Sequence, residues 1–217
     1  SETTKETLIS KGVKAEHIKV INTFLPPSKS EINGTLPLEV MDFINSKKNI
    51  IVANAYKLYR DNLGTDVYGL DMCIEACRRI PESNFIFCVP IISDFEYFDE
   101  CKNRIKEYGI ADRFFIVNKD ISLVSLFKYV DLFVRPTSTD SFGVSVAEAL
   151  AMGVPAIASD VCVRAEGTIT FQSRNQNEFN QLIRELLKEE INLRSGVNMV
   201  YIIQKYVELY QSKNGKS

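Results

Sequence analysis

The sequence predicts an α/β fold in which a Rossmann-like parallel sheet carries helices on both faces. Short apolar runs alternate with amphipathic helical stretches along most of the 217 residues, and this alternation is typical of β-α-β units with right-handed crossovers. One run, residues 154–158, is apolar on both sides, as in a strand buried between two layers. The stretch 135–161 combines a strand end, a polar loop, a helix, a glycine stop and a second strand.

Hydrophobic periodicity predicts the elements in chain order. Short apolar runs between polar or glycine-containing turns predict strands at residues 50–53, 85–89, 114–117, 132–134, 154–158 and 167–171. Apolar residues that recur every three or four positions predict helices at residues 3–12, 38–45, 69–79, 95–108, 122–129, 143–153, 178–190 and 197–210. A further strand-like run over residues 18–25 ends at two prolines, and residues 28–35 are expected to form a polar linker.

Composition and charge exclude several classes of function. The chain is 45% hydrophobic and 25% charged with a formal net charge of -2, which is typical of a globular protein and argues against binding to nucleic acid. It contains no apolar run long enough to cross a bilayer and does not begin with a signal peptide. The cytoplasm is therefore the expected compartment.

Histidine and cysteine are not arranged as in most hydrolases and metal sites. The single histidine, His17, lies in a charged stretch without a nucleophile motif, so His-dependent hydrolysis and His-ligated zinc are not expected. The five cysteines are odd in number and lack disulfide spacing, which is typical of reduced thiols. Cys73 and Cys77 lie one helical turn apart, but no histidine or second cysteine pair completes a metal site with them.

The loop after Arg135 has the features of an anion site. The helix that follows it presents unpaired N–H groups and the positive end of its dipole, and ligands of open α/β sheets collect where strands end and helices begin. Residues 140–145 are therefore a candidate phosphate cradle, with Gly143 allowing close approach. Asp140 and Glu148 flank this cradle and can hold hydroxyl groups of a ligand.

Helix capping is an alternative explanation of the same residues. Asp140 or Ser141 can cap the helix through its side chain, and Ser145 and Glu148 have the spacing of a capping box. Spacing alone leaves the anion site and the cap equally supported.

The segment 140–160, DSFGVSVAEALAMGVPAIASD, resembles the Glu-x7-Glu signature and the following strand of retaining glycosyltransferases of family 4, which have the two-domain GT-B fold. The first Glu of this signature is Asp140 here, and the second is Glu148. Within the family, the segment together with Arg135-Pro-Thr and the downstream Arg164-x-Glu166-Gly167 is most similar to bacterial enzymes of capsular or surface polysaccharide synthesis.

The resemblance implies a binding site for a UDP- or GDP-linked sugar, with neither a separate cofactor nor an obligatory metal. In such a site Glu148 holds the ribose hydroxyls, the helix start holds phosphate, and Asp140 with neighbouring backbone groups orients the sugar. The residues implicated in this way are Asp140, Phe142, Gly143, Val144, Ser145 and Glu148.

Two cations of the family pattern are missing from this chain. Most members carry a Gly-Arg pair after the first strand of the donor domain and a Lys-Gly pair before the next helix, and both cations neutralise the donor diphosphate. Here these positions hold Ala55-Tyr56 and Tyr68-Gly69. Lys57 and Arg135 are the favoured replacements because one follows a strand and the other ends one at the expected ligand edge, although each can also be a solvated or ion-paired cation, an alternative that weighs more for Lys57 than for Arg135. The remaining candidates are Arg60 and Arg164.

Residues 115–120 correspond to the loop that meets the nucleobase in the family, and the resemblance places Val117 and Lys119 there. An ordinary turn, with Asp120 capping the helix that starts near Ser122, accounts for this loop equally well.

The resemblance also divides the chain into domains. The pattern Gly12-Val-x4-Ile-x-Val-Ile closes the N-terminal acceptor domain in the family, so residues 1–28 are expected to be the tail of that domain with a linker. Residues 29–217 are expected to be the donor-binding domain with a terminal helix, which packs either on its own domain or on the acceptor domain. This half alone is expected to transfer no sugar, because half of the cleft is absent.

The sequence thus supports the hypothesis of a hexosyltransferase donor domain in polysaccharide synthesis. Its expected partners are a nucleotide-diphospho-sugar and a glycan or lipid-linked acceptor, with peripheral membrane contact of the full-length protein and no nucleic acid. Two alternatives stay open. One is a nucleotide-sugar epimerase, although those enzymes use histidine and additional acids that this chain lacks. The other is a non-catalytic binding or assembly module, which the missing cations suggest.

Overall fold

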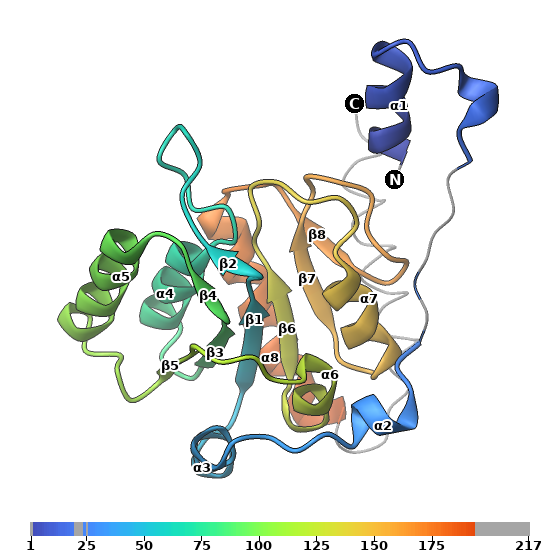
Figure 1. The fold of residues 1–217 in the computed structure, drawn as a ribbon. Coiled ribbons are helices and arrows are strands. Elements are labelled where there is room, and N and C mark those ends of the chain that lie inside the picture. Colours follow the sequence, from blue (N-terminus) through green and yellow to red (C-terminus); the bar gives the residue numbers. More distant parts are fainter. Residues whose placement is uncertain (1, 20–23, 25, 194–217) are drawn as a thin grey trace, which may run out of the picture.

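A six-stranded sheet, parallel throughout, is the centre of the molecule, and its strand order is β5-β3-β1-β6-β7-β8 (Figure 1). The computed structural model describes residues 2–19, 24 and 26–193. The strands are β1 (Ile50–Asn54), β3 (Asn84–Cys88), β5 (Phe114–Val117), β6 (Leu132–Arg135), β7 (Ala156–Ser159) and β8 (Ile169–Phe171). In the central register Val52 lies beside Ile86 of β3 on one side and Phe133 of β6 on the other. These residues are apolar because both faces of the sheet are covered.

Helices cover the two faces and form a separate hydrophobic core on each. One core joins the sheet to α4 (Leu70–Arg79), α5 (Phe95–Glu107) and α8 (Gln176–Leu193). The other joins it to α3 (Leu38–Ser46), α6 (Leu123–Leu126) and α7 (Val144–Ala151).

Successive residues of a strand point to opposite faces, and the composition of the two cores follows this period. Ile51 and Ala53 belong to the core with α4, whereas Ile50 and Val52 belong to the core with α7. On α8 the buried residues recur at helical spacing; they are Phe179, Leu182, Ile183, Leu186 and Leu187.

The predicted α/β class and all six predicted strands of the sheet are confirmed, with ends that shift by one or two residues. The helix expected over residues 122–129 is divided into α6 and a 3-10 turn, η2 (Phe127–Tyr129). The N-terminal helix is α1 (Glu2–Ser10), and a 3-10 turn, η1 (Ala15–His17), follows it. The strand-like run over 18–25 falls mostly, and the helix over 197–210 entirely, outside the described residues.

Two features were not predicted. A second, two-stranded parallel sheet pairs β2 (Lys57–Leu58) with β4 (Ile91–Ile92), and strands this short leave no periodic signal. The expected polar linker contains a helical turn, α2 (Lys29–Ile32), because Ser28 and Glu31 form a capping box. Ser125 also donates a hydrogen bond of 2.7 Å to the Glu31 carbonyl, which fastens this turn to α6.

All five cysteines are free thiols, as expected, and four of them are buried. Burial raises the pKa of Cys88 to about 12.

In the part of the chain that the structure describes, no helix combines the length and the apolar character that crossing a membrane requires.

Candidate functional site

The strand order creates a topological switch point between β1 and β6. The chain leaves β1 towards β3 on one side and leaves β6 towards β7 on the other, so the loops at their carboxyl ends diverge and open a crevice. Asn54 is the last residue of β1 and Arg135 the last of β6. Both side chains therefore lie where open α/β sheets bind their ligands.

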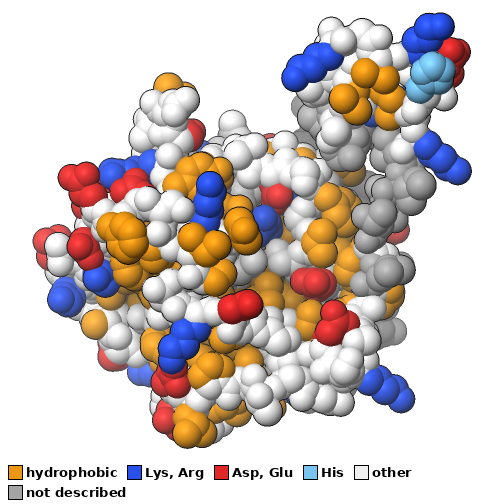
Figure 2. Space-filling view, in the orientation of Figure 1, with side chains coloured by type: hydrophobic (Ala, Val, Ile, Leu, Met, Phe, Trp, Pro, Cys, Tyr) orange, Lys and Arg blue, Asp and Glu red, His pale blue; other side chains and the backbone are white. Residues whose placement is uncertain are grey.

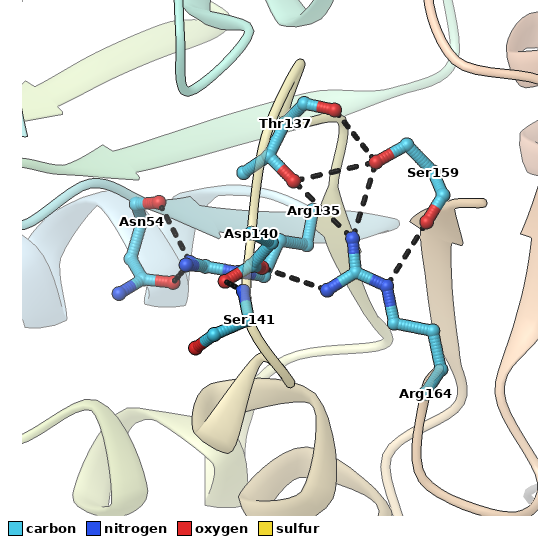
Figure 3. Close-up of polar contacts among 7 residues, drawn as sticks. All are labelled: Asn54, Arg135, Thr137, Asp140, Ser141, Ser159 and Arg164. Carbon is cyan, nitrogen blue, oxygen red and sulfur yellow. Dashed lines mark hydrogen bonds and ion pairs between the residues drawn. The ribbon is translucent and has the colours of Figure 1, made fainter. Parts of the chain in front are cut away.

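Arg135, Asp140 and Arg164 form a compact ionic cluster at this crevice (Figure 3). The Oδ2 atom of Asp140 accepts hydrogen bonds from Arg135 Nε at 2.6 Å and from Arg164 Nη1 at 2.7 Å. Arg135 Nη1 also donates to Asn54 Oδ1 at 3.1 Å, which links the ends of β6 and β1. Because two guanidinium groups face one carboxylate, the cluster keeps a positive charge at the edge of the sheet.

The exposed fraction of each side chain shows that the cluster is largely desolvated. It is 12% for Arg135, 9% for Asp140 and 2% for Arg164. Buried ion pairs of this kind persist only where further hydrogen bonds satisfy the groups involved. Arg164 has these in Ser159 and Thr137, and Arg135 has them in Asn54.

The pKa of Asp140 is lowered by the two arginines. Burial by itself raises this pKa, but hydrogen bonds and charge from Arg135 and Arg164 outweigh burial and bring it below its usual range. Asp140 is therefore a carboxylate at neutral pH, able to accept hydrogen bonds but not to donate one.

The variant Asp140→Asn tests this assignment through the pH dependence of stability. At pH 7 it should be less stable than the parent by about 3 kcal/mol, because two buried guanidinium groups lose their anion. The ionised carboxylate stabilises the fold fully above its unfolded pKa of about 3.9, and this stability is lost as the pH falls through the lowered folded pKa. The free-energy difference between parent and variant should thus shrink below about pH 4, as measured by urea unfolding. A difference that does not change with pH would contradict the pairing.

Helix α7 begins beside the cluster and is not capped by a side chain. Its N-cap is Gly143, at φ 76°, and no side chain of the described residues makes a capping hydrogen bond. Capping by Asp140 or Ser141 and the capping box from Ser145 to Glu148 are therefore wrong as explanations of these residues. The N–H groups of Val146 and Ala147 donate to the Gly143 carbonyl, which leaves the N–H groups ahead of them at the positive end of the helix.

Glu148 lies on α7, one turn beyond its start, and its side chain is half-buried. Burial raises the pKa of this carboxyl, and the charge of Glu31 raises it further. Among the residues that the structure describes, none forms a hydrogen bond or ion pair with its carboxylate. A charged group that is partly desolvated without a partner disfavours folding, so its presence is better explained by a ligand than by stability. Figure 2 shows acidic groups among hydrophobic side chains on the face where α7 lies.

The remaining residues of the predicted site differ in their surroundings. Near the cluster, Phe142 is partly buried, Val144 is 55% exposed and Ser145 is buried. Lys57 lies on β2 with Nζ 4.8 Å from the centre of the Tyr59 ring. Its contacts do not include the arginine cluster.

The two residues of the predicted nucleobase loop form contacts with other residues of the domain. Val117 ends β5 with a buried side chain, and its carbonyl accepts a hydrogen bond from the N–H of Val89 at 3.0 Å. Lys119 forms an ion pair with Glu39 of α3. The expected turn with a capped helix is present, but its cap is Ser122 rather than Asp120.

Three contacts of the cluster were not among the predicted site residues: Asn54, Thr137 and Ser159. All three lie at or near the carboxyl ends of strands. Since open α/β sheets bind ligands at that edge, this position alone could have marked them as candidate site residues. Tyr68, which takes the place of the family's lysine, lies with its ring centre 5.6 Å from the Arg135 guanidinium carbon. The aromatic ring thus makes a cation–π contact with this guanidinium.

No metal-binding group of three or more His, Cys, Asp or Glu side chains occurs in residues 2–19, 24 and 26–193. The site therefore offers a fixed carboxylate, a second carboxylate without a partner among the described residues, a net positive cluster and a helix start. Together they suit a ligand that has both hydroxyl groups and negatively charged oxygens.

Comparison with known proteins gives the family of the chain. The family model "Glycosyl transferases group 1" matches residues 62–199. The lipopolysaccharide core biosynthesis mannosyltransferase LpsB of Rhizobium meliloti (strain 1021) is 39% identical over 62 residues, which are 29% of this chain and 18% of LpsB.

Solved structures of glycosyltransferases share the fold. Anabaena HepE, in complex with UDP, aligns with a TM-score of 0.69 and 17% identity over 98% of this chain and 62% of HepE. A glycosyltransferase from Rickettsia africae ESF-5 aligns with a TM-score of 0.70 and 15% identity over 100% of this chain and 63% of that protein. The lipopolysaccharide outer core galactosyltransferase WaaB aligns at 0.59, with 17% identity, over 94% of this chain and 54% of WaaB. The chain spans less than two thirds of each of these proteins. Since the family model matches more than half of its residues, the chain belongs to the group 1 family of glycosyl transferases.

Proposed function

We propose that this chain is the donor-binding domain of a retaining glycosyltransferase of family 4. It binds a nucleoside diphosphate sugar at the switch point, for transfer of a hexosyl group to a glycan or lipid-linked acceptor in polysaccharide synthesis. The observation that carries the proposal is the half-buried Glu148, which has no partner in the described part of the chain and lies on the helix whose positive end is beside the Arg135–Asp140–Arg164 cluster.

Each group of the site has a role that follows from its chemistry. Glu148 accepts hydrogen bonds from the two ribose hydroxyls, as acidic residues do in other nucleotide-binding α/β folds. The start of α7, at Gly143, Val144 and Ser145, receives phosphate oxygens. Asp140, with the backbone of Phe142 and Gly143, orients the sugar. Val117 and Lys119 stay predictions for contacts with the nucleobase.

Stabilisation of the departing diphosphate is the main catalytic demand on this domain. Negative charge builds on the phosphate oxygens as the glycosidic bond breaks, and preorganised positive groups lower the energy of that state. Arg135, with its net positive cluster, and the dipole of α7 meet this demand in place of the family's missing arginine and lysine. Lys57 is a second candidate cation. The diphosphate itself accepts the acceptor's proton, so the domain needs no general base of its own.

The similar proteins support a nucleotide-sugar and a polysaccharide context. HepE has been crystallised with UDP, with UDP and glucose, and with UDP-glucose. LpsB is named as a mannosyltransferase of lipopolysaccharide core biosynthesis, and WaaB as a lipopolysaccharide outer core galactosyltransferase. We place this chain with enzymes of capsular or surface polysaccharides, acting in the bacterial cytoplasm in peripheral contact with the membrane. In this proposal residues 1–28 form the junction with an acceptor domain. We expect no sugar transfer in the absence of that acceptor domain.

Calorimetric titration with UDP, GDP and the matching nucleosides tests the proposal. We expect saturable binding of at least one diphosphate, with an affinity about tenfold or more above that of its nucleoside, because charge-assisted bonds to phosphate contribute about 1.5–3 kcal/mol each. Absence of binding by both diphosphates would exclude a donor site.

A non-catalytic module is the second candidate, and it is favoured by one observation. Tyr56 and Tyr68 take the places where the family has an arginine and a lysine. A full-length protein that binds nucleotide saturably but transfers no sugar would support this role, whereas efficient transfer would exclude it.

A further inference from the structure

We propose that Arg164 is a positioning residue that fixes Asp140 and the start of α7, while Arg135 is the arginine that contacts a bound diphosphate. This division of roles between two arginines on the same carboxylate rests on the proposed donor site. It assigns a function to Arg164, whose loop lies between β7 and β8.

Nearly all the N–H donors of the Arg164 guanidinium form hydrogen bonds within the protein. Its Nε donates to the Ser159 carbonyl at 2.9 Å, and its Nη2 donates to Ser159 Oγ at 3.1 Å and to Thr137 Oγ1 at 3.2 Å. Its Nη1 donates to Asp140 Oδ2 at 2.7 Å. Ser159 and Thr137 are fully buried, and the Arg164 side chain is 2% exposed (Figure 3). A guanidinium has five N–H donors, so little capacity and no open path remain for a ligand.

Arg135 differs in the donors that it has left. Its Nε is bound to Asp140 and its Nη1 to Asn54, but no described residue accepts a hydrogen bond from its Nη2. No buried side-chain nitrogen or oxygen of the described residues is without a partner, so this Nη2 reaches solvent. Arg135 thus has a free donor at the crevice, and its side chain is 12% exposed against 2% for Arg164.

Arg164 also sets the position of the backbone at the start of α7. A Cβ atom added to Gly143 would lie 2.6 Å from Arg164 Nη1 and 3.3 Å from Asp140 Oδ2. The guanidinium therefore packs directly against this glycine, and the same atom that holds Asp140 supports the turn from which the phosphate-facing N–H groups project. Arg164 acts on a ligand through these two neighbours and does not touch it.

Two arginine variants separate the roles when each is titrated with UDP, UDP-glucose and uridine, or with GDP, GDP-mannose and guanosine if the parent prefers guanine. Arg135→Gln should weaken diphosphate binding about 10- to 100-fold and leave nucleoside binding within about threefold of the parent. Arg164→Gln should weaken binding of the nucleotide-sugar about tenfold or more and that of the diphosphate by a clearly smaller factor, because both ligands meet the start of α7 but Asp140 orients only the sugar.

A double-mutant cycle with Asp140→Asn shows whether Arg164 acts through the carboxylate. In that background Arg164→Gln should weaken nucleotide-sugar binding no more than it weakens diphosphate binding, whereas Arg135→Gln should still cost diphosphate affinity. Arg164→Lys, which keeps the charge, should restore part of the sugar affinity. Should Arg164→Gln fail to fold in urea titrations, Thr137→Val removes one support of the guanidinium and should give the same selective loss on a smaller scale.

Three results would overturn the assignment: equal losses of diphosphate and nucleotide-sugar in a folded Arg164 variant, no loss at all, or additive effects with Asp140→Asn. Failure of the donor site itself is visible separately, because the parent would then bind neither UDP nor GDP.

Discussion

Glu148→Ala should weaken binding of UDP or GDP by about 10- to 100-fold, because it removes the acceptor of two hydrogen bonds between a carboxylate and ribose hydroxyls. The free energy of unfolding should not decrease. A carboxyl whose folded pKa is raised disfavours the folded state once it ionises, so its removal should leave stability at pH 7 unchanged or higher. Loss of affinity together with unchanged or higher stability is the pattern expected of a functional residue. Isothermal titration calorimetry and urea unfolding measure the two quantities.

A matched control separates this effect from a general change in charge. Glu107, at the end of α5, is exposed and far along the chain from α7, and Glu107→Ala removes the same group. It should bind nucleotide as the parent does. Equal affinity of Glu148→Ala and the parent would remove Glu148 from the site.

Gly69→Ala should destabilise the protein by about 3 kcal/mol or more, the second large effect that we expect. Gly69 is the N-cap of α4 at φ 74°, where an alanine costs about 1–2 kcal/mol. Its added Cβ would also lie 2.7 Å from Pro136 Cγ and closer still to the Pro136 carbonyl, so the loop after β6 would have to move. Overpacking of this kind adds about 1–3 kcal/mol. Urea unfolding measures the total.

Gly64→Ala is the control, because Gly64 has almost the same backbone angle, φ 77°, but no atom within 4 Å of an added Cβ. It should show only the conformational cost of about 1–2 kcal/mol. The difference between the two variants isolates the contact with Pro136, the residue that follows Arg135. If both variants lost the same free energy of unfolding, the loop after β6 would move away from α4 without a measurable loss of stability.

Tyr68, which stands where the family has a lysine, is fixed at its backbone by a buried carboxylate. The N–H of Tyr68 donates to buried Asp66 at 2.9 Å, and this carboxylate also accepts from the Tyr97 hydroxyl at 2.8 Å. The ring of this tyrosine lies next to Arg135, with its centre 5.6 Å from the guanidinium carbon. An aromatic side chain in this place supplies no charge, but it restricts a neighbouring arginine that does.

Periodicity was sufficient to predict the secondary structure of most of the described chain, because long apolar stripes and runs reflect burial on one or two faces. The strands β2 and β4 were missed for a physical reason: two residues, such as Lys57 and Leu58, cannot show a period. The turn α2 was missed because its capping box lies in a stretch without apolar residues on a stripe.

The sequence by itself determined the α/β class, the strand that ends at Arg135, the helix that starts after Gly143, and the resemblance of this segment to a glycosyltransferase signature. These are local properties, because each depends on residues that are close together in the sequence. Only the tertiary structure decided that Asp140 pairs with two arginines and does not cap α7. Capping and a cluster at a strand edge use the same residue types at the same spacing, and which of them forms depends on partners that are distant in sequence. Arg164 follows Asp140 by 24 positions and Asn54 precedes Arg135 by 81, yet parallel strands bring their carboxyl ends to one edge, where the four side chains meet.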